Sequence, residues 1–294
     1  MTEDIRDRPT IDHADVMALN FVNAAAPVVF RRHFRQGLRS HVLEILDPQA
    51  VAVERKGTMV DGVMRFPKAE PRRMLRIFRT RLHTLDEALD EIGRVKIVER
   101  FLAPDCMATS VECIVDYRGP DGWHPVLCGF QEYVPGQTLD PWTILDQTTL
   151  LSSLYDQFVA KEDGIALSKR LWVSVVRQKT RRFVDRIKCM IAEAGHIPDL
   201  AGVGNLIVTT EGDIRLVDIN NISRIGFEAS IPLDEKGYPV CDKSVEALAL
   251  IEAKVLGSAV DLQSKLFRHY LEPGRKKAVN DHEVRFWKQR SDGG

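Results

Sequence analysis

The stretch HIPDLAGVGNLIVTTEGDIRLVD, residues 196–218, decides the fold. Asp199 precedes a glycine-rich loop, and Asn205 opens a strand-like run after it. The turn at 211–213 returns a second run that ends at Asp218, so a hairpin brings Asn205 and Asp218 near one end of the ladder. An Asn oxygen beside an Asp carboxylate suits Mg²⁺ and nucleotide phosphates. Asp199, in the loop, is placed to accept a proton from an attacking hydroxyl.

The chain around this stretch has a strand-like pattern in its first part and a helix-like pattern in its second, which together predict an α+β protein. Residues 46–134 are strand-rich: short β-prone runs fill 51–79, and three more strands are expected at 95–101, 109–117 and 125–134, with a turn at 119–123 between the last two. Thr84 and Glu87 form a capping box for one helix between these strands, which is expected to end at Gly93.

Residues 135–294 read as mostly helical, with the hairpin and a basic tail, and an amphipathic helix is expected over 171–194 with Gly195 ending it. Residues 1–45 are expected to be an N-terminal helical extension that packs on the body, since the run 17–34 is apolar and then basic. This order suggests two lobes with a cleft between them.

Composition excludes several classes of protein. The 294 residues include 41 Lys+Arg and 42 Asp+Glu, and this near-zero net charge argues against a globally basic nucleic-acid binder. The five cysteines form no CxxC pair, which favours reduced thiols over a disulfide framework or a zinc site. There is no stretch of 18 apolar residues, so we expect no membrane span and a cytoplasmic location.

The deciding stretch resembles the catalytic loop and metal-binding hairpin of the protein-kinase-like superfamily, which includes aminoglycoside and choline phosphotransferases. That family has H-x-D, four residues, N, and then an Asp at the spacing that separates Asn205 from Asp218 here. Residues 131–136, QEYVPG, are similar to the family's hinge segment. The resemblance implies a bilobal fold with a β-rich N-lobe and a helical C-lobe, and a nucleotide whose adenine edge meets the Glu132 C=O and the Val134 N–H.

By the same resemblance, Asp199 is the catalytic residue, and Asn205 and Asp218 hold Mg²⁺ on the phosphates of ATP. The cation for those phosphates is Arg76 or Lys68, and Arg76 is preferred because its strand leads directly into the helix at Thr84. Glu91 is the expected acidic partner of that cation, since Glu87 is used by the capping box.

The sequence also departs from the family pattern. Asp199 lies six residues before Asn205, one more than in the family, and no GxGxxG or APE segment is present. Two readings therefore stay open. The first is an ATP- and Mg²⁺-dependent phosphotransferase that acts on an unidentified, small-molecule hydroxyl acceptor. The second is a pseudokinase, a nucleotide-binding regulatory or scaffold module with weak or no catalysis.

Basic residues gather in three runs, at 72–81, at 169–188 and in the tail after Arg275. A solvated face is the default interpretation of such a run. An anionic partner at one of these faces is the sharper hypothesis.

Overall fold

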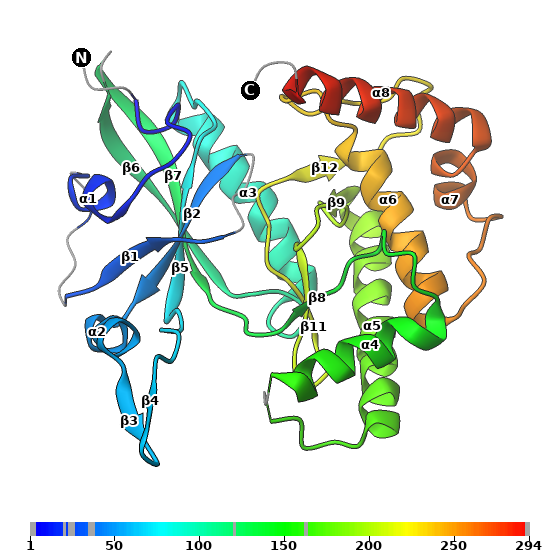
Figure 1. Ribbon diagram of the computed structural model, residues 1–294. Coiled ribbons are helices and arrows are strands. Elements are labelled where there is room, and N and C mark those ends of the chain that lie inside the picture. Colours follow the sequence, from blue (N-terminus) through cyan, green and yellow to red (C-terminus); the bar gives the residue numbers. More distant parts are fainter. Residues whose placement is uncertain are drawn as a thin grey trace. The chain divides into compact units, whose positions relative to one another are not determined.

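The computed structural model describes residues 4–19, 22, 27–34, 39–119, 122–161 and 164–291. The chain divides into two compact units, Met1–Gly93 with Ala108–Tyr133, and Arg94–Met107 with Val134–Gly294. The first unit is rich in strands and the second in helices (Figure 1). The predicted β-rich N-terminal part and helical C-terminal part are therefore confirmed. Within the described ranges, no helix is both long and apolar enough to cross a membrane.

The first unit is built on a five-stranded antiparallel sheet in the order β1-β2-β5-β7-β6 (Figure 1). The strands are β1 (Val29–Arg32), β2 (Ser40–Leu46), β5 (Arg73–Phe78), β6 (Ser110–Gly119) and β7 (Gly122–Glu132). The central strand β5 is buried from Met74 to Phe78. Leu75 and Ile77 pack with residues of the N-terminal segment, and Phe78 packs with Ala88 of the following helix. Because both faces are covered, β5 is buried continuously from Met74 to Phe78 instead of alternating, and this stretch includes the side chain of Arg76.

The predicted N-terminal helical extension is wrong. One short helix forms, α1 (His13–Met17), but residues 29–32 and 40–46 are strands of the main sheet. Neither run alternates clearly between apolar and polar residues, so the sequence does not distinguish strand from helix, and the strand pairing decides between them. The N-terminal segment also belongs to the core of this unit, since Ile5 and Val16 are buried in it. Residues 20–21 and 23–26, inside the predicted helical run, lie outside the described residues.

Two further element predictions are wrong. The run AVAVERK at 50–56, expected to be a strand, lies in helix α2 (Pro48–Lys56), which begins with Asp47 as N-cap and Pro48 in its first turn. The helix that begins at Leu85 continues past Gly93 to Leu102 as α3, so the strand expected at 95–101 does not exist. Residues 95, 98 and 102 are buried at helical spacing, and an exposed glycine inside a helix costs only about 1 kcal/mol.

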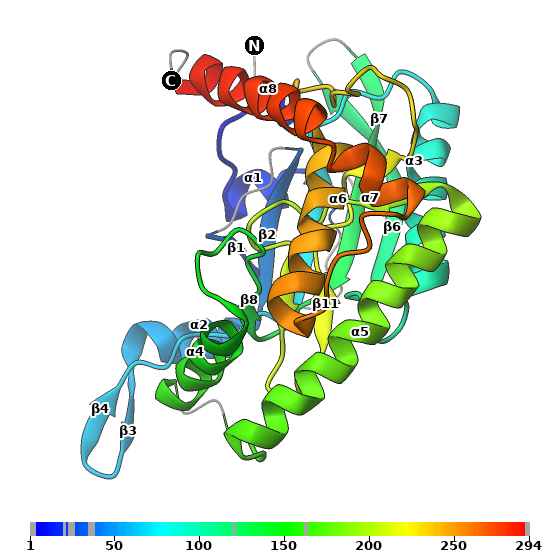
Figure 2. The same ribbon diagram turned by 90° about the vertical axis from the view of Figure 1, so that its right-hand side faces the viewer.

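A hairpin, β3 (Thr58–Val60) with β4 (Val63–Arg65), follows α2 and projects from the first unit (Figure 2). Asp61 and Gly62 form its two-residue turn, both with positive φ, as the Asp-Gly pair predicts. All six strand residues are exposed. The predicted strands at 109–117 and 125–134 are confirmed as β6 and β7, while two residues of the expected turn, 120 and 121, lie outside the described residues.

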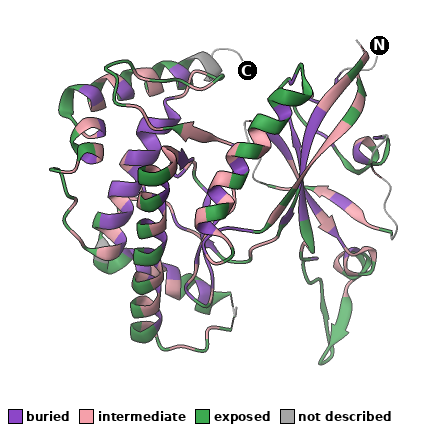
Figure 3. Ribbon diagram, turned by 180° about the vertical axis from the view of Figure 1, so that it is seen from behind, coloured by how far each residue is buried: buried purple, intermediate pink, exposed green. Residues whose placement is uncertain are grey.

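The second unit has its core around α5 (Lys169–Ala194) and α6 (Val240–Ile251), whose inner faces are buried (Figure 3). The predicted helix over 171–194 and its end at Gly195, which has φ 65°, are confirmed. Buried residues recur along α5 at helical spacing and include Trp172, Val176, Phe183 and Ile187. Around these lie α4 (Gln147–Ala160), the π-helix η1 (Glu252–Leu256), α7 (Lys265–Tyr270) and α8 (Pro273–Ser291).

Two small sheets in this unit carry the deciding stretch. Strands β8 (Gln137–Thr138), β10 (Leu206–Val208) and β11 (Ile214–Leu216) form one sheet in the order β11-β10-β8. Strands β9 (His196–Pro198) and β12 (Ile222–Arg224) form the other. The predicted hairpin is therefore present as β10–β11, and the segment after Pro135 runs beside it. Gly136 passes so close to β10 that a Cβ atom there would lie 2.3 Å from the Val208 oxygen.

Gly136→Ala tests this close approach. The added methyl group must displace the backbone of β10, so we expect the free energy of unfolding to fall by about 1–3 kcal/mol. Gly93→Ala is the matched control: a Cβ atom there meets nothing within 4 Å, and Ala in place of Gly in a helix should stabilise by about 1 kcal/mol. Urea unfolding of both variants measures the difference, and equal effects would contradict the account.

Candidate functional site

The loop from Asp199 to Asn205 begins where β9 ends. The Asp199 N–H donates to the Asn221 oxygen at 2.8 Å, which extends the β9–β12 pairing by one bond. The Asp199 carboxylate then accepts from the N–H groups of Ala201 at 2.9 Å and Gly202 at 3.1 Å. An Asp side chain that bonds its own following backbone in this way favours a turn. The loop therefore has a defined conformation in which one carboxylate oxygen is held from within.

Two residues distant in sequence fix the same loop from outside. The Trp142 ring N–H donates to the Ala201 oxygen at 2.8 Å. The Ser244 hydroxyl, on α6, accepts from the Leu200 N–H at 3.2 Å. Each bond gives a partner to a backbone group of the turn that no helix or strand pairing satisfies. Neither residue is predicted from the sequence, since no local pattern ties position 142 or 244 to the loop.

Asn205 closes the loop with its side chain. Its Nδ2 donates to the Asp199 backbone oxygen at 2.9 Å, and its own backbone oxygen accepts from Val217 at 2.8 Å. The side chain lies against Gly202, where a Cβ atom would come within 2.5 Å of Nδ2 and 2.7 Å of Oδ1. Only glycine at 202 leaves room for this amide. With the nitrogen committed to Asp199, Oδ1 is the atom left to bind a cation.

Asp218 lies at the same end of the hairpin. The ladder pairs Leu206 with Leu216, so Asn205 faces Val217, the neighbour of Asp218. The Asp218 carboxylate accepts from the Asn220 N–H at 3.1 Å. Its charge acts on Asp199: the pKa of Asp199 is raised to about 6, first by burial and second by the negative charge of Asp218. The structure thus brings together Asp199, Asn205 and Asp218.

This donor set fits Mg²⁺. The amide oxygen of Asn205 and the carboxylate of Asp218 are hard ligands, and the repulsion between Asp218 and Asp199 would be relieved by a cation. Among the described residues, no group of three or more His, Cys, Asp or Glu side chains has the arrangement of a metal site. Mg²⁺ commonly takes one or two protein carboxylates and completes its shell with water and substrate phosphates.

The expected phosphate cation, Arg76, lies in the middle of β5 with its side chain 2% exposed. Its guanidinium donates to the Ser110 hydroxyl at 3.4 Å and lies 3.9 Å from the Glu112 carboxylate. The strand register explains why Arg76 lies near Glu112. Arg76 pairs with Gly129 on β7, and Gly129 pairs with Glu112 on β6. Glu112 was not predicted from the sequence.

The other predicted residues of the first unit lie elsewhere. Lys68 is exposed in the connection between β4 and β5, with its Nζ 6.0 Å from the centre of the Phe34 ring. It is therefore not on the strand that leads to α3, which leaves Arg76 as the better match to the prediction. Glu91 lies on α3. Its pairing with Arg76 stays a prediction.

The expected hinge segment lies where the two units meet in sequence, since one unit ends at Tyr133 and the other begins at Val134. Glu132 closes strand β7, and its side chain accepts from the Thr109 N–H at 3.0 Å and the Thr109 hydroxyl at 3.1 Å. These bonds order the backbone just before Val134. Adenine binding by the Glu132 C=O and the Val134 N–H stays a prediction.

Comparisons with known proteins do not identify a family for this chain. No protein family matches the sequence, and no curated protein matches it. Among solved structures, the chain is similar to one described as "ROP18 kinase domain in complex with AMP-PNP and sucrose". The identity is 12%, over 90% of this chain and 80% of that chain, with a TM-score of 0.36. Because so low a score does not establish a common topology, function has to be argued from the residues of this chain.

The raised pKa of Asp199 predicts an effect on stability. A folded-state pKa of about 6 against an ordinary 3.8 means that stability is lost as pH rises from 3.8 to 6. In the absence of divalent cations, Asp199→Asn should therefore be more stable than wild type at pH 7.5, and equal to it at pH 4. The gain is at most about 3 kcal/mol, because Asp199 keeps some contact with solvent.

Thermal unfolding in EDTA across this pH range measures the effect. Asp146→Asn is the control of opposite sign, because hydrogen bonds from Thr148 and Thr149 hold the pKa of Asp146 down at about 2. That carboxylate stabilises the protein above its ordinary pKa, so its removal should lower stability at pH 7.5. A destabilised Asp199→Asn variant at pH 7.5 would show that Asp199 is an ordinary turn residue.

Proposed function

We propose that this protein is an ATP- and Mg²⁺-dependent phosphotransferase of kinase-like fold, which acts on a hydroxyl group of a small molecule. The observation that supports it best is the grouping of Asp199, Asn205 and Asp218, in which the pKa of Asp199 is about 6. A carboxylate with a pKa close to neutral can both take and release a proton at physiological pH. An amide oxygen and a second carboxylate beside it supply ligands for a metal-bound phosphate.

In this proposal each residue of the loop has one task. Asp199 orients the acceptor hydroxyl and takes its proton as the new O–P bond forms. Asn205 and Asp218 hold Mg²⁺, which would neutralise charge on the transferring phosphate. Trp142 and Ser244 keep the loop backbone fixed through their bonds to Ala201 and Leu200. Transfer of a phosphoryl group depends mainly on positioning and charge neutralisation, so a rigid loop with few polar groups is sufficient.

The nucleotide contacts are assigned to residues of the first unit and the connection after it. Adenine would be recognised by the backbone of Glu132 and Val134, and Arg76 would steady the phosphates with Glu91 as its partner. The support for these assignments is the sequence pattern, together with the position of Arg76 on the strand that precedes α3. The choice of a small-molecule acceptor is supported by the lack of an APE segment in the sequence.

One observation favours the second reading, a pseudokinase that binds nucleotide as a regulatory or scaffold module. The Arg76 side chain is 2% exposed and lies among Ser110 and Glu112 of its own sheet. An arginine so enclosed makes its contacts within its own sheet, as a structural residue does. The second reading keeps nucleotide binding by Asn205 and Asp218 and abandons turnover.

ATP turnover with a panel of hydroxyl acceptors separates the two readings. We expect wild type to consume ATP when the right acceptor is present, and Asp199→Asn to lower kcat by about 100-fold or more, as loss of a general base does. Asp218→Ala should abolish turnover and also weaken ATP binding in the presence of Mg²⁺. Asp213→Ala, a carboxylate on the far turn of the same hairpin that pairs with Lys179 at 2.8 Å, is the matched control and should leave kcat unchanged.

Thermal stabilisation by ATP and Mg²⁺ completes the test, since a ligand that binds the native state raises its stability. Stabilisation of wild type but not of Asp218→Ala, without turnover on any acceptor, would establish the pseudokinase reading. Equal behaviour of wild type and Asp218→Ala in both assays would reject the proposed site.

A further inference from the structure

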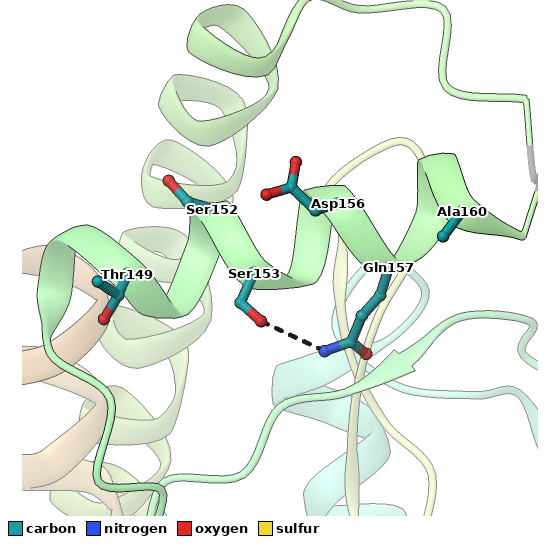
Figure 4. Close-up of a pocket in the computed structure, with 6 residues that line it drawn as sticks. All are labelled: Thr149, Ser152, Ser153, Asp156, Gln157 and Ala160. Atoms are coloured by element: carbon teal, nitrogen blue, oxygen red, sulfur yellow. Dashed lines mark hydrogen bonds between the residues drawn. The ribbon is translucent and has the colours of Figure 1, made fainter.

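Helices α4 and α5 of the second unit lie against each other and border an open hollow of about 570 Å³. Ser152 of α4 and five residues of α5 line it: Lys169, Arg170, Val173, Ser174 and Arg177. The α5 residues recur at intervals of three and four, so they belong to one face of the helix. A second hollow along α4 shares Ser152 with it and is also lined by Ser153 and Asp156 (Figure 4).

Several cations of α5 outside the hollow are paired with carboxylates. Lys179 pairs with Asp213 at 2.8 Å, Arg182 pairs with Asp105 at 2.8 Å, and Lys188 pairs with Glu252. Arg170 and Arg177 have no ion pair or hydrogen bond to any described part of the chain, although both line the hollow. Two arginines without a partner among the described residues therefore line the recess beside α4, while Arg181, which has none either, lies away from it.

Arg177 has a further feature that points to a ligand. Its Nε is buried from solvent and has no hydrogen-bond partner among the described residues. A buried N–H group without an acceptor is costly, so this guanidinium does not make its full set of hydrogen bonds within the chain. Because Nε is shielded from solvent, an oxyanion in the hollow would accept from the Nη groups of Arg177, the groups with which arginine also binds phosphate.

The charge of the hollow is positive after its internal pairing. Lys169 is bonded to Asp156 at 2.8 and 2.9 Å, so these two charges offset each other. The charges of Arg170 and Arg177 remain. The hydroxyl groups of Ser152 and Ser174 add neutral donors beside them, and the positive end of the α5 dipole lies at Lys169 and Arg170, in the first turn.

We propose that this hollow binds a small, multiply charged phosphate compound, held by Arg170 and Arg177 with the hydroxyl groups of Ser152 and Ser174. Its volume falls within the range of small-molecule sites, which favours a compact ligand over a long polymer. The site is independent of Asn205 and Asp218, and it explains part of the basic run at 169–188 that the proposed phosphotransferase does not use.

Binding of inorganic pyrophosphate, measured by isothermal titration calorimetry in EDTA, tests the proposal on the full-length protein. We expect wild type to bind, and Arg170→Gln and Arg177→Gln each to weaken binding about tenfold or more, since each removes charge-assisted hydrogen bonds. Arg181→Gln is the matched control, because Arg181 is an exposed arginine of the same helix that does not line the hollow. Its affinity should equal that of wild type.

Three results would overturn the proposal. The first is no binding by wild type, and the second is equal weakening by Arg181→Gln, which would show a general attraction to a basic surface. The third is loss of pyrophosphate binding in Asp218→Ala, which would move the ligand to the proposed phosphotransferase site. Retained binding in Asp218→Ala supports this site even if the phosphotransferase proposal fails. Arg170 is exposed, so its variant remains informative if Arg177→Gln does not fold.

Discussion

The hydrogen bond from the Asn205 side chain to the Asp199 backbone oxygen is the interaction on which the candidate site depends. It ties the start of the loop to the start of β10, and so fixes where the Asp199 carboxylate lies relative to Asp218. The bond is possible only because residue 202 has no side chain. The side-chain oxygen of the same amide lies beside Gly202. One contact therefore ties the backbone of Asp199 to Asn205, two of the three residues on which the proposed function rests.

The site also holds one carboxylate, that of Asp199, in surroundings that disfavour its charged form. Two carboxylates share one end of a short hairpin, and one of them is buried enough for its pKa to rise to about 6. The packing of β10 and β11 does not depend on these carboxylates, because the apolar residues of the two strands already contribute to the core. Titratable groups with strongly shifted pKa values concentrate at functional sites, which is why we attach the function to this loop rather than to the buried Arg76.

Sequence reasoning was most successful where the pattern was local. The β10–β11 hairpin, the helix before it, and the closeness of Asn205 and Asp218 follow from turn residues and spacing, whereas the role expected of Asp199 rests on the resemblance. Within the loop, the Asp199 carboxylate forms a turn by accepting from the N–H groups of Ala201 and Gly202. The failures came where long-range pairing decides. Residues 29–32 and 40–46 form strands although the sequence predicts helix, because neither run shows a clear alternation of apolar and polar residues. Glu112 and Trp142 were missed because strand register and tertiary packing, not spacing, bring them to their partners.

The β3–β4 hairpin has a chemical consequence for anyone who handles this protein. Strand pairing places Met59 opposite Met64 on one face of the hairpin, and the two side chains are 61% and 49% exposed. Thioethers in such positions are oxidised before those in the core. Conversion to the sulfoxide would turn this apolar surface polar without disturbing the sheet behind it. The fraction of Met59 and Met64 in the sulfoxide form, measured by mass spectrometry of the peptide that carries them, should therefore report how far a sample has been oxidised.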